Sequence, residues 1–219
     1  MILEGIVTTI NADGTVNISP MGPIVDDALT RLELRPFQTS TTFQNLRRAR
    51  QGVFHVSDDV ELLARAAVGR LETPPRMVRS VRVDGWILAD ACRFYAFEVR
   101  ELDESDERAR LVAEVVDSGR ARDFFGFNRA KHAVVEAAIL ATRVHFLPRD
   151  EIMADFARWN VLVEKTGGPQ ERRAFDFLEA YVRDAFAKAN PLSQAGTNAV
   201  NSSAPGAETS SSDSSQHPN

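Results

Sequence analysis

Four hydroxyl side chains stand in a row at residues 39–42, within the stretch RPFQTSTTFQNLRR. A short helix is expected to begin inside this run and to end before Gly52. The first turn of a helix has unpaired N–H groups and a partial positive charge, so hydroxyl donors and the forked cation of Arg35 would suit a phosphate. The alternative is that one hydroxyl caps the helix and the others are ordinary residues. The stretch lacks a glycine-rich P-loop, which argues against a nucleoside triphosphate.

A second helix start, in NRAKHAVVEAAILATR, has Arg129 and Lys131 in its first turn. Cations there oppose the helix dipole at a cost on the order of tenths of a kcal/mol, and a bound anion would reverse that sign. The rest of this helix is apolar nearly all round, which predicts that it is buried. Glu136 follows His132 by four residues, so the two could pair. This polar seam either faces a ligand or forms salt bridges between packed helices or subunits.

A third stretch, NISPMGPIV at residues 17–25, ends a predicted strand with two prolines. Pro20 and Pro23 bracket Met21 and Gly22, so the strand must stop there and its backbone polar groups become available to a ligand. A rigid turn without any ligand would give the same pattern.

Residues for catalysis without a cofactor are sparse. The histidines lack the spacing of metal ligands and the chain has no CxxC, so no metal site is predicted. There is no G-x-S-x-G nucleophile motif, and Cys92 lies in an apolar strand, where it reads as a small core residue. If the protein is an enzyme, a cofactor is expected to carry the chemistry.

The composition is that of a soluble globular protein, with 219 residues of which 43% are hydrophobic and 26% charged. The net charge of −5 argues against a nucleic-acid partner, which would call for a basic excess. One cysteine and no recognisable signal peptide predict a reduced, cytoplasmic location. No run reaches the roughly 18 apolar residues that a membrane span needs, so no membrane association is expected.

The elements that would position these residues fall into two parts. Residues 1–126 read as strands with short helices, which predicts a barrel; DGWILADACRFYAFEVREL within it reads as one bent strand or a hairpin. Residues 127–189 contain three helix patterns with clear start and stop signals. The Ser/Ala/Asn-rich segment 190–219 is predicted to be disordered. The fold class is therefore mainly β with α (α+β), a barrel followed by a three-helix segment.

Several strings together resemble a known family: GIVTT, DGTVNISPMGP, RPFQTSTTFQNL, GVFHVSDDV and FFGFNRAKHAVVEAAILATR. Each string alone is weak, but their order and spacing over residues 1–189 resemble the family called domain of unknown function 447. The resemblance implies an FMN-binding split barrel, similar to flavin reductases and pyridoxamine-phosphate oxidases, with a C-terminal helical part. It also implies a homodimer with FMN at or near the subunit interface.

The resemblance assigns residues to the FMN site. The isoalloxazine ring would be bordered by Asn17, Ser19, Pro20 and Met21. The phosphate would be surrounded by Thr39, Ser40, Thr41, Thr42 and Asn45, with Arg35 nearby. Arg129 and Lys131 are candidates for a cation near the ring, from the same or the second subunit. The family's substrate is not established, so the function is either a flavin-dependent oxidoreductase or a non-catalytic binder of a flavin, deazaflavin or pterin, such as a carrier, sensor or scaffold.

Overall fold

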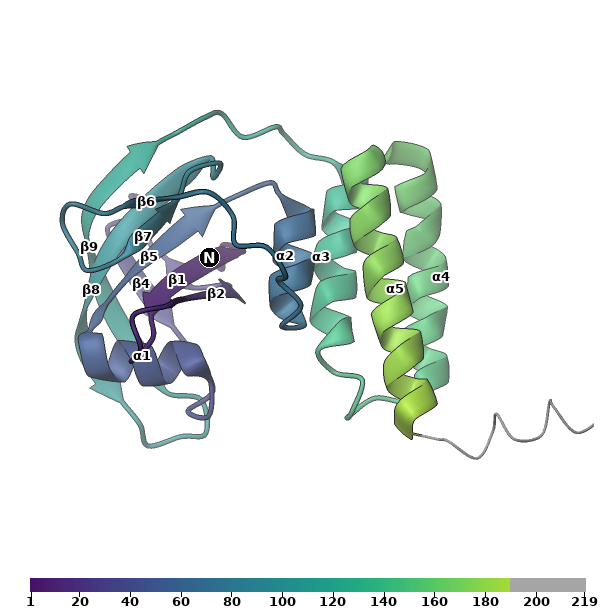
Figure 1. Ribbon diagram of the computed structural model, residues 1–219, viewed down its shortest axis with the longest axis horizontal. Coiled ribbons are helices and arrows are strands. Elements are labelled where there is room, and N and C mark those ends of the chain that lie inside the picture. The colour runs from purple at the N-terminus through teal and green to yellow at the C-terminus, as the bar shows by residue number, and fades with distance from the viewer. Residues whose placement is uncertain (190–219) are drawn as a thin grey trace, which may run out of the picture.

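The computed structural model describes residues 1–189, and the segment predicted to be disordered lies outside them. A curled sheet and a bundle of helices lie side by side (Figure 1). The strands are β1 (Gly5–Ile10), β2 (Val16–Met21), β3 (Ile24–Val25), β4 (Arg31–Leu34), β5 (Gln51–Val56), β6 (Met77–Arg79), β7 (Trp86–Leu88), β8 (Arg93–Asp103) and β9 (Arg110–Arg120). The helices are α1 (Thr41–Ala49), α2 (Val60–Ala67), α3 (Arg129–Ala141), α4 (Arg149–Thr166) and α5 (Pro169–Ala189).

Seven strands form one antiparallel sheet in the order β2-β1-β5-β8-β9-β4-β3. The residues before β1 close this sheet on itself, because Leu3 N–H donates to the Pro23 carbonyl (3.1 Å) and Val25 N–H donates to the Met1 carbonyl (2.8 Å). β2 stays outside this closure and pairs with β1 alone. The predicted α+β fold, a split barrel followed by three helices, is confirmed.

The aromatic-rich stretch before residue 103 is neither one bent strand nor a hairpin. β7 pairs with β6 in a separate two-stranded sheet, whereas β8 pairs with β5 and β9. A turn in which Ala91 N–H donates to the Leu88 carbonyl (3.2 Å) separates β7 from β8. The residue preferences for strand were interpreted correctly, but the partners of each strand depend on contacts distant in sequence.

Side-chain caps fix the helix starts. Ser40 caps α1, Asp59 caps α2 and Asn128 caps α3, each accepting a hydrogen bond from a backbone N–H in the first turn. α1 ends at Arg50, whose φ of 56° is left-handed, just before Gly52 as predicted. Every helix in residues 1–189 is too short or too polar to cross a membrane.

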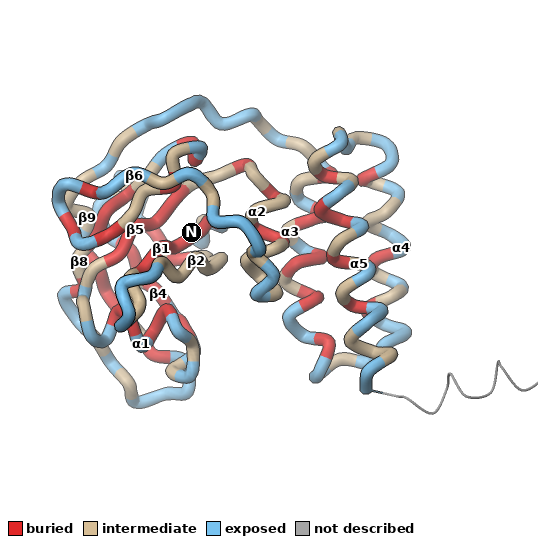
Figure 2. Tube along the Cα trace, in the orientation of Figure 1, coloured by how far each residue is buried: buried red, intermediate tan, exposed pale blue. Residues whose placement is uncertain are grey.

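Two large hydrophobic cores stabilise the barrel and the helical part (Figure 2), and a small third cluster consists of Val53, Val83 and Ala96. One fills the barrel, where Phe43 of α1 packs with Phe54 and Phe97 of the sheet. The other lies among α3, α4 and α5, and it also includes Leu63 of α2 and Ile6 of β1. The strand β1 therefore has a hydrophobic core on each of its faces. Because α2 and β1 both contribute to the helical core, the division into domains at residue 126 stays a prediction.

Candidate functional site

A cluster of polar side chains joins the first turns of α1 to the hairpin of β1 and β2. Asn17 Nδ2 donates to Thr42 Oγ1 (3.0 Å) and to Thr9 Oγ1 (3.2 Å). Asn45 Nδ2 donates to the same Thr9 hydroxyl (3.0 Å) and to Asn11 Oδ1 (2.8 Å). Thr9, Thr42 and Asn45 are buried. Three residues predicted from the sequence for one site, Asn17, Thr42 and Asn45, therefore lie together, although Asn17 and Thr42 are 25 positions apart.

The start of α1 has the properties of an anion site. Ser40 Oγ caps the helix by accepting from Phe43 N–H (3.2 Å), while the side chains of Thr39 and Thr41 are exposed. The first turn has no acidic residue. Within residues 1–189, no protein acceptor is bonded to the N–H groups of Thr41 and Thr42. These donors sit where the partial positive charge of the helix is greatest, so they fit a phosphate.

Arg35 is engaged elsewhere. Its guanidinium donates from Nε (2.8 Å) and Nη2 (2.6 Å) to the carboxylate of Glu33, and these hydrogen bonds, together with Arg110, hold the pKa of Glu33 below its usual value. The side chain is 57% exposed. The structure therefore brings Asn17, Thr42 and Asn45 together with the start of α1 but does not direct Arg35 to them.

The strand β2 leads away from this cluster along an open edge of the sheet. Ser19, Pro20 and Met21 are half-buried, and within the described residues β2 has a paired strand on one side only. From Asn17 to Met21 the strand covers about 13 Å at ~3.3 Å per residue. At its end, a Cβ added to Gly22 would lie 2.8 Å from Glu4 Oε1, so the lack of a side chain lets the Glu4 carboxylate approach.

A cavity of about 300 Å³ lies next to Glu4, between the barrel and α3. Its apolar walls include Leu3 of the N-terminal segment, Val56 of β5, Val135 of α3 and Phe124 of the connection to α3. Its polar lining includes Glu4, Lys131, His132 and Glu136. Of the twelve site residues predicted from the sequence, Lys131 alone lines this cavity.

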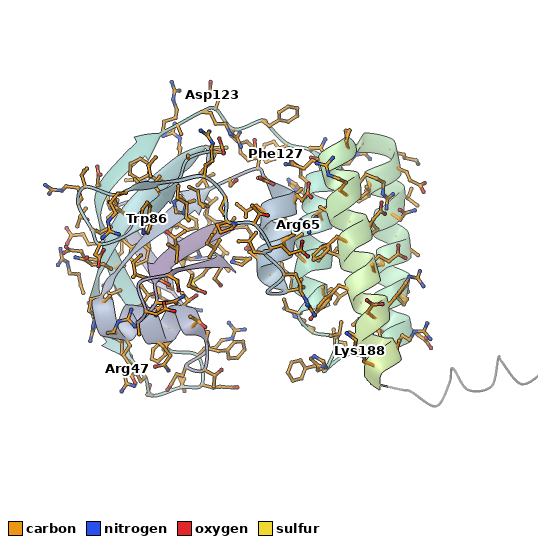
Figure 3. All side chains as sticks on the ribbon, viewed as in Figure 1. Arg47, Arg65, Trp86, Asp123, Phe127 and Lys188 are labelled. Carbon is orange, nitrogen blue, oxygen red and sulfur yellow. The ribbon has the colours of Figure 1, made fainter. Side chains whose placement is uncertain are left out.

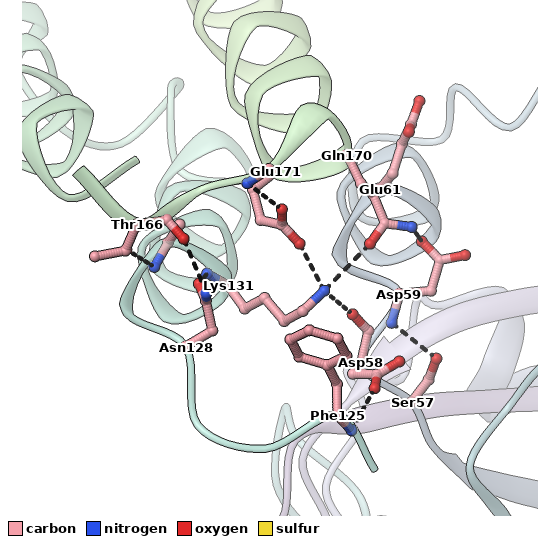
Figure 4. A network of polar contacts seen from close by, with 12 residues as sticks. Ser57, Asp58, Asp59, Glu61, Phe125, Asn128, Lys131, Thr166, Gln170 and Glu171 are labelled. Carbon is pink, nitrogen blue, oxygen red and sulfur yellow. Dashed lines mark hydrogen bonds and ion pairs between the residues drawn. The ribbon is translucent and has the colours of Figure 1, made fainter. Parts of the chain in front are cut away.

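Lys131 is held in a polar network between the barrel and the helices (Figure 4). Its ammonium donates to three acceptors: Glu171 Oε1 (2.6 Å), the Asp58 carbonyl oxygen (2.8 Å) and Gln170 Oε1 (3.2 Å). Burial alone would raise the pKa of Glu171, but the hydrogen bonds from Lys131 and from Gly168 N–H outweigh it and lower that pKa. An ammonium has three donors, so Lys131 has none left for a ligand in this arrangement.

The carboxylate of Asp58 is equally well satisfied. It accepts from both terminal nitrogens of Arg122, one at 3.0 Å, and from Phe125 N–H (2.8 Å). The hydrogen bonds from Arg122 lower the pKa of Asp58 to about 2 in spite of its burial. This contact fixes the connection between β9 and α3 on the end of β5.

The predicted polar seam on α3 faces the cavity. His132 and Glu136 both line it, and no ion pair joins them in the part of the chain that the structure describes. Burial, and then the negative charge of Glu136, raises the pKa of Glu4. Arg129 is exposed at the first position of α3, and no acceptor for it is found within residues 1–189. Within residues 1–189 Glu136 forms no salt bridge, so the alternative of a salt-bridged seam between helices is not found there.

Sequence reasoning missed the groups that complete these arrangements. Thr9 and Asn11 complete the α1 cluster, and Glu4, Asp58 and Glu171 surround the cavity and its network. A signal existed for Thr9, because a polar residue in the apolar strand GIVTTI needs a partner. Within residues 1–189, no three His, Cys, Asp or Glu side chains gather in a way that could hold a metal ion.

The molecule combines a split barrel that has an open edge strand, a helix start suited to an anion, and a separate cavity between the barrel and α3. The chain belongs to the family described as protein of unknown function DUF447, whose N-terminal domain matches residues 3–122 and whose C-terminal part matches residues 128–180. The family recognised from the sequence is thereby confirmed. Among curated proteins, none matches the chain.

Solved structures resemble this chain to different extents. The FMN-bound protein MM1853 from Methanosarcina mazei, of the same family, has a TM-score of 0.67 and 23% identity, with 82% of this chain and 94% of that chain covered. A flavin reductase domain protein from Arthrobacter sp. FB24 has a TM-score of 0.48 and 19% identity, over 56% of this chain and 79% of that one. The 2-nitrobenzoate 2-nitroreductase NbaA of Pseudomonas fluorescens has a TM-score of 0.46 and 16% identity, over 53% and 64%.

Proposed function

We propose that the protein binds FMN, with the phosphate at the start of α1 and the ring along β2. The observation that carries the proposal is the hydrogen bond from Asn17 to Thr42, because it joins the strand predicted to border the ring to the helix start predicted to hold the phosphate. The FMN bound to the Methanosarcina mazei protein, which has the same fold and family, supports the choice of ligand.

Each part of the site would make a different contribution. Thr39, Thr41 and Thr42 would offer hydroxyl and N–H donors to the phosphate, helped by the helix dipole. Ser40, also predicted to bind the phosphate, would instead hold the start of the helix in place, because its hydroxyl (2.7 Å) and its N–H (3.0 Å) both donate to the Phe37 carbonyl. The open edge of β2, from Asn17 through Ser19 and Pro20 to Met21, would offer backbone groups to the polar edge of the ring. FMN, when bound, supplies reversible transfer of electrons or hydride. The proposal relies on these groups rather than on Arg35, because Glu33 engages its guanidinium.

The further parts of the proposal are a flavin-dependent oxidoreductase, a homodimer with the flavin near the interface, and a cytoplasmic location. The cavity beside Glu4 supports a small-molecule substrate, since it adjoins the end of β2. The single cysteine, which is free and buried, supports a reducing compartment.

The second candidate function is that of a non-catalytic flavin or pterin binder. It is favoured by Lys131 and Asp58 beside the cavity, whose polar groups are fully hydrogen-bonded within the protein. Fast bleaching of the flavin-loaded protein by reduced nicotinamides, with turnover on adding an acceptor, would favour the enzyme.

A comparison of FMN with riboflavin tests the phosphate site. Thr41→Ala, and Thr41→Ala with Thr42→Ala, should weaken FMN binding much more than riboflavin binding, by about 1.5–3 kcal/mol for each charge-assisted bond lost, or roughly 10–150-fold. Thr41 is exposed, so the single variant tests the site without disturbing the core. Thr73→Ala, in an exposed loop, is the matched control.

Two results would contradict the proposal. Equal losses for FMN and riboflavin would show that the start of α1 does not hold the phosphate. A wild-type protein that takes up no FMN in the titration would show that FMN is not its cofactor. Mass spectrometry of small molecules released from the purified protein would then separate a deazaflavin or a pterin from no ligand at all.

A further inference from the structure

Large apolar side chains are exposed on two segments that meet at the cavity. Met1 and Ile2 are 77% and 62% exposed, directly before Leu3, which lines the cavity. Phe125 and Phe127 are 77% and 95% exposed on either side of Gly126, which also lines it. Exposed apolar side chains that gather on one face mark an interaction surface, whereas scattered ones do not. We name the surface formed by Met1, Ile2, Phe124, Phe125 and Phe127 around the cavity the aromatic face.

The phenylalanines of this face are presented on a backbone that is fixed on both sides. Phe125 N–H donates to the Asp58 carboxylate (2.8 Å), and Asn128 Nδ2 donates to the Thr166 carbonyl (2.9 Å). The ring of Phe127 packs edge-on against His132, with 6.1 Å between the ring centroids. Figure 3 labels Phe127 where the connection from the barrel meets α3. Fixed aromatic side chains lose little entropy on binding, so they are suited to anchor a partner.

The charges on the aromatic face are complementary to those on the same face of a second copy of the chain. Glu4 and Glu136 lie close enough for one to raise the pKa of the other, and no cation pairs with either within residues 1–189. Arg129, two residues after Phe127, is exposed at the start of α3, one turn before the cavity-lining His132, and has no acid partner in the described part of the chain. Across a two-fold axis, a contact between residue i of one subunit and residue j of the other occurs a second time with the subunits exchanged, so such an interface could place this cation on these carboxylates twice.

We propose that the aromatic face binds a second copy of this chain, with Phe127 of one copy entering the cavity of the other and Arg129 reaching Glu4 and Glu136. The proposal deepens the homodimer of the proposed function and identifies its surface, but it does not depend on which ligand is bound. It also gives the second copy a part in closing the cavity beside the end of β2. Net charge and the carboxylates at the cavity make a second copy a better occupant than an anionic lipid surface.

Sedimentation velocity of the full chain over a dilution series tests the aromatic part. Phe127→Glu should weaken dimerisation at least about 100-fold, because each substitution acts twice across a two-fold interface and buries a charge. Phe127 is 95% exposed, so its replacement leaves the core intact. Phe146→Glu, at an 82% exposed residue between α3 and α4, is the matched control and should have no effect.

A charge exchange tests the ionic part. Arg129→Glu and Glu136→Arg should each weaken the dimer, and the combined variant should regain most of the affinity. Arg129→Glu places an acid at the start of α3, which favours the helix, so a weaker dimer could not be attributed to a less stable fold. Arg143→Glu, beyond the end of α3, serves as the control.

Three results would overturn the proposal, and each is distinct from a failure of FMN binding. A dimer that responds equally to Phe127→Glu and Phe146→Glu would use another surface. A wild type that stays monomeric at every concentration would contradict both the homodimer and the assignment of the aromatic face as its interface. A monomer that co-sediments with vesicles of phosphatidylcholine and phosphatidylserine would assign the aromatic face to membranes. FMN absorbance, recorded on the same samples, reports on the cofactor separately.

Discussion

Replacing Lys131 with methionine would show whether this residue stabilises the junction between barrel and helices. The side chains of Lys131 and Glu171 are only 13% and 9% exposed, and 2.6 Å separates Nζ from Oε1. Methionine keeps the apolar stem and removes the charge, which leaves the Glu171 carboxylate buried without its cation. Breaking a buried ion pair by removing one partner costs about 3–5 kcal/mol. Glu171 retains the hydrogen bond from Gly168 N–H (2.8 Å), so the lower value of about 3 kcal/mol is expected.

Thermal unfolding followed by circular dichroism measures this cost. A change of 1 kcal/mol moves the Tm of a chain of this size by roughly 2–4 °C, so Lys131→Met should lower it by about 6–12 °C. Lys188→Met is the matched control, because Lys188 is exposed near the end of α5 (Figure 3) and should change stability by less than about 0.5 kcal/mol. Adding Glu171→Leu to Lys131→Met should recover most of the loss, since no unpaired buried charge then remains.

The outcome distinguishes two roles for Lys131. If Lys131→Met melts at the same temperature as Lys188→Met, the network does not stabilise the junction and the reasoning from burial is wrong. If its Tm is unchanged but its FMN affinity falls, Lys131 contacts the cofactor, as the cationic start of this helix suggested from the sequence. A lower Tm with normal FMN affinity in the folded fraction supports the structural role.

Two further predictions follow from single sites. The pKa of Asp58 is lowered from 3.8 to about 2, so the ionised carboxylate stabilises the fold by roughly 2 kcal/mol above pH ~4, and this stabilisation is progressively lost as the pH falls toward 2. Urea unfolding across this pH range should show that Asp58→Asn removes this part of the pH dependence. An unchanged pH dependence in the variant would contradict the pairing with Arg122. Gly5→Ala should destabilise the protein by about 3 kcal/mol in the same assay, because a Cβ would meet the His55 carbonyl and come within 2.6 Å of the Phe54 ring; a variant as stable as the wild type would refute this close packing.

The local signals in the sequence predicted where helices begin and end. The start of α1 was placed within residues 39–42, where Ser40 proves to be the cap, and Asn128 could be recognised as the cap of α3, because a capping side chain bonds to a backbone group two or three residues away. The strand partners could not be recognised in this way. β1 lies between β2 and β5, and its contact with β5 joins residues nearly 50 positions apart, such as Ile6 and His55. Such pairings depend on the packing of the whole chain.

The basic residues show why part of the site could be predicted and part could not. A cation at the start of α3 indicated an anion nearby, and an anion is present, but it is Glu171 from α5, forty residues further along the chain. Arg35 was expected near the phosphate, but the anion that it contacts is Glu33, two residues earlier in the chain and in the adjoining strand β4, so a local partner was available in the sequence. Charge patterns thus indicate that a partner exists, while only the fold decides whether the protein itself supplies it.

The junction network and the aromatic face are physically linked, and this bears on how the cavity is built. Lys131 holds the Asp58 carbonyl, and the Asp58 carboxylate holds Arg122 and Phe125 N–H, so the position of the aromatic face depends on contacts made deep between barrel and helices. The same helix α3 that buries Lys131 also presents to the cavity His132, the next residue, and Glu136, which lies one turn further along. A polar network that is fully hydrogen-bonded rigidifies its surroundings. The engaged groups therefore fix the geometry, whereas Glu4, Glu136 and Arg129, which have no ion-pair partner within residues 1–189, remain to interact with whatever covers the cavity.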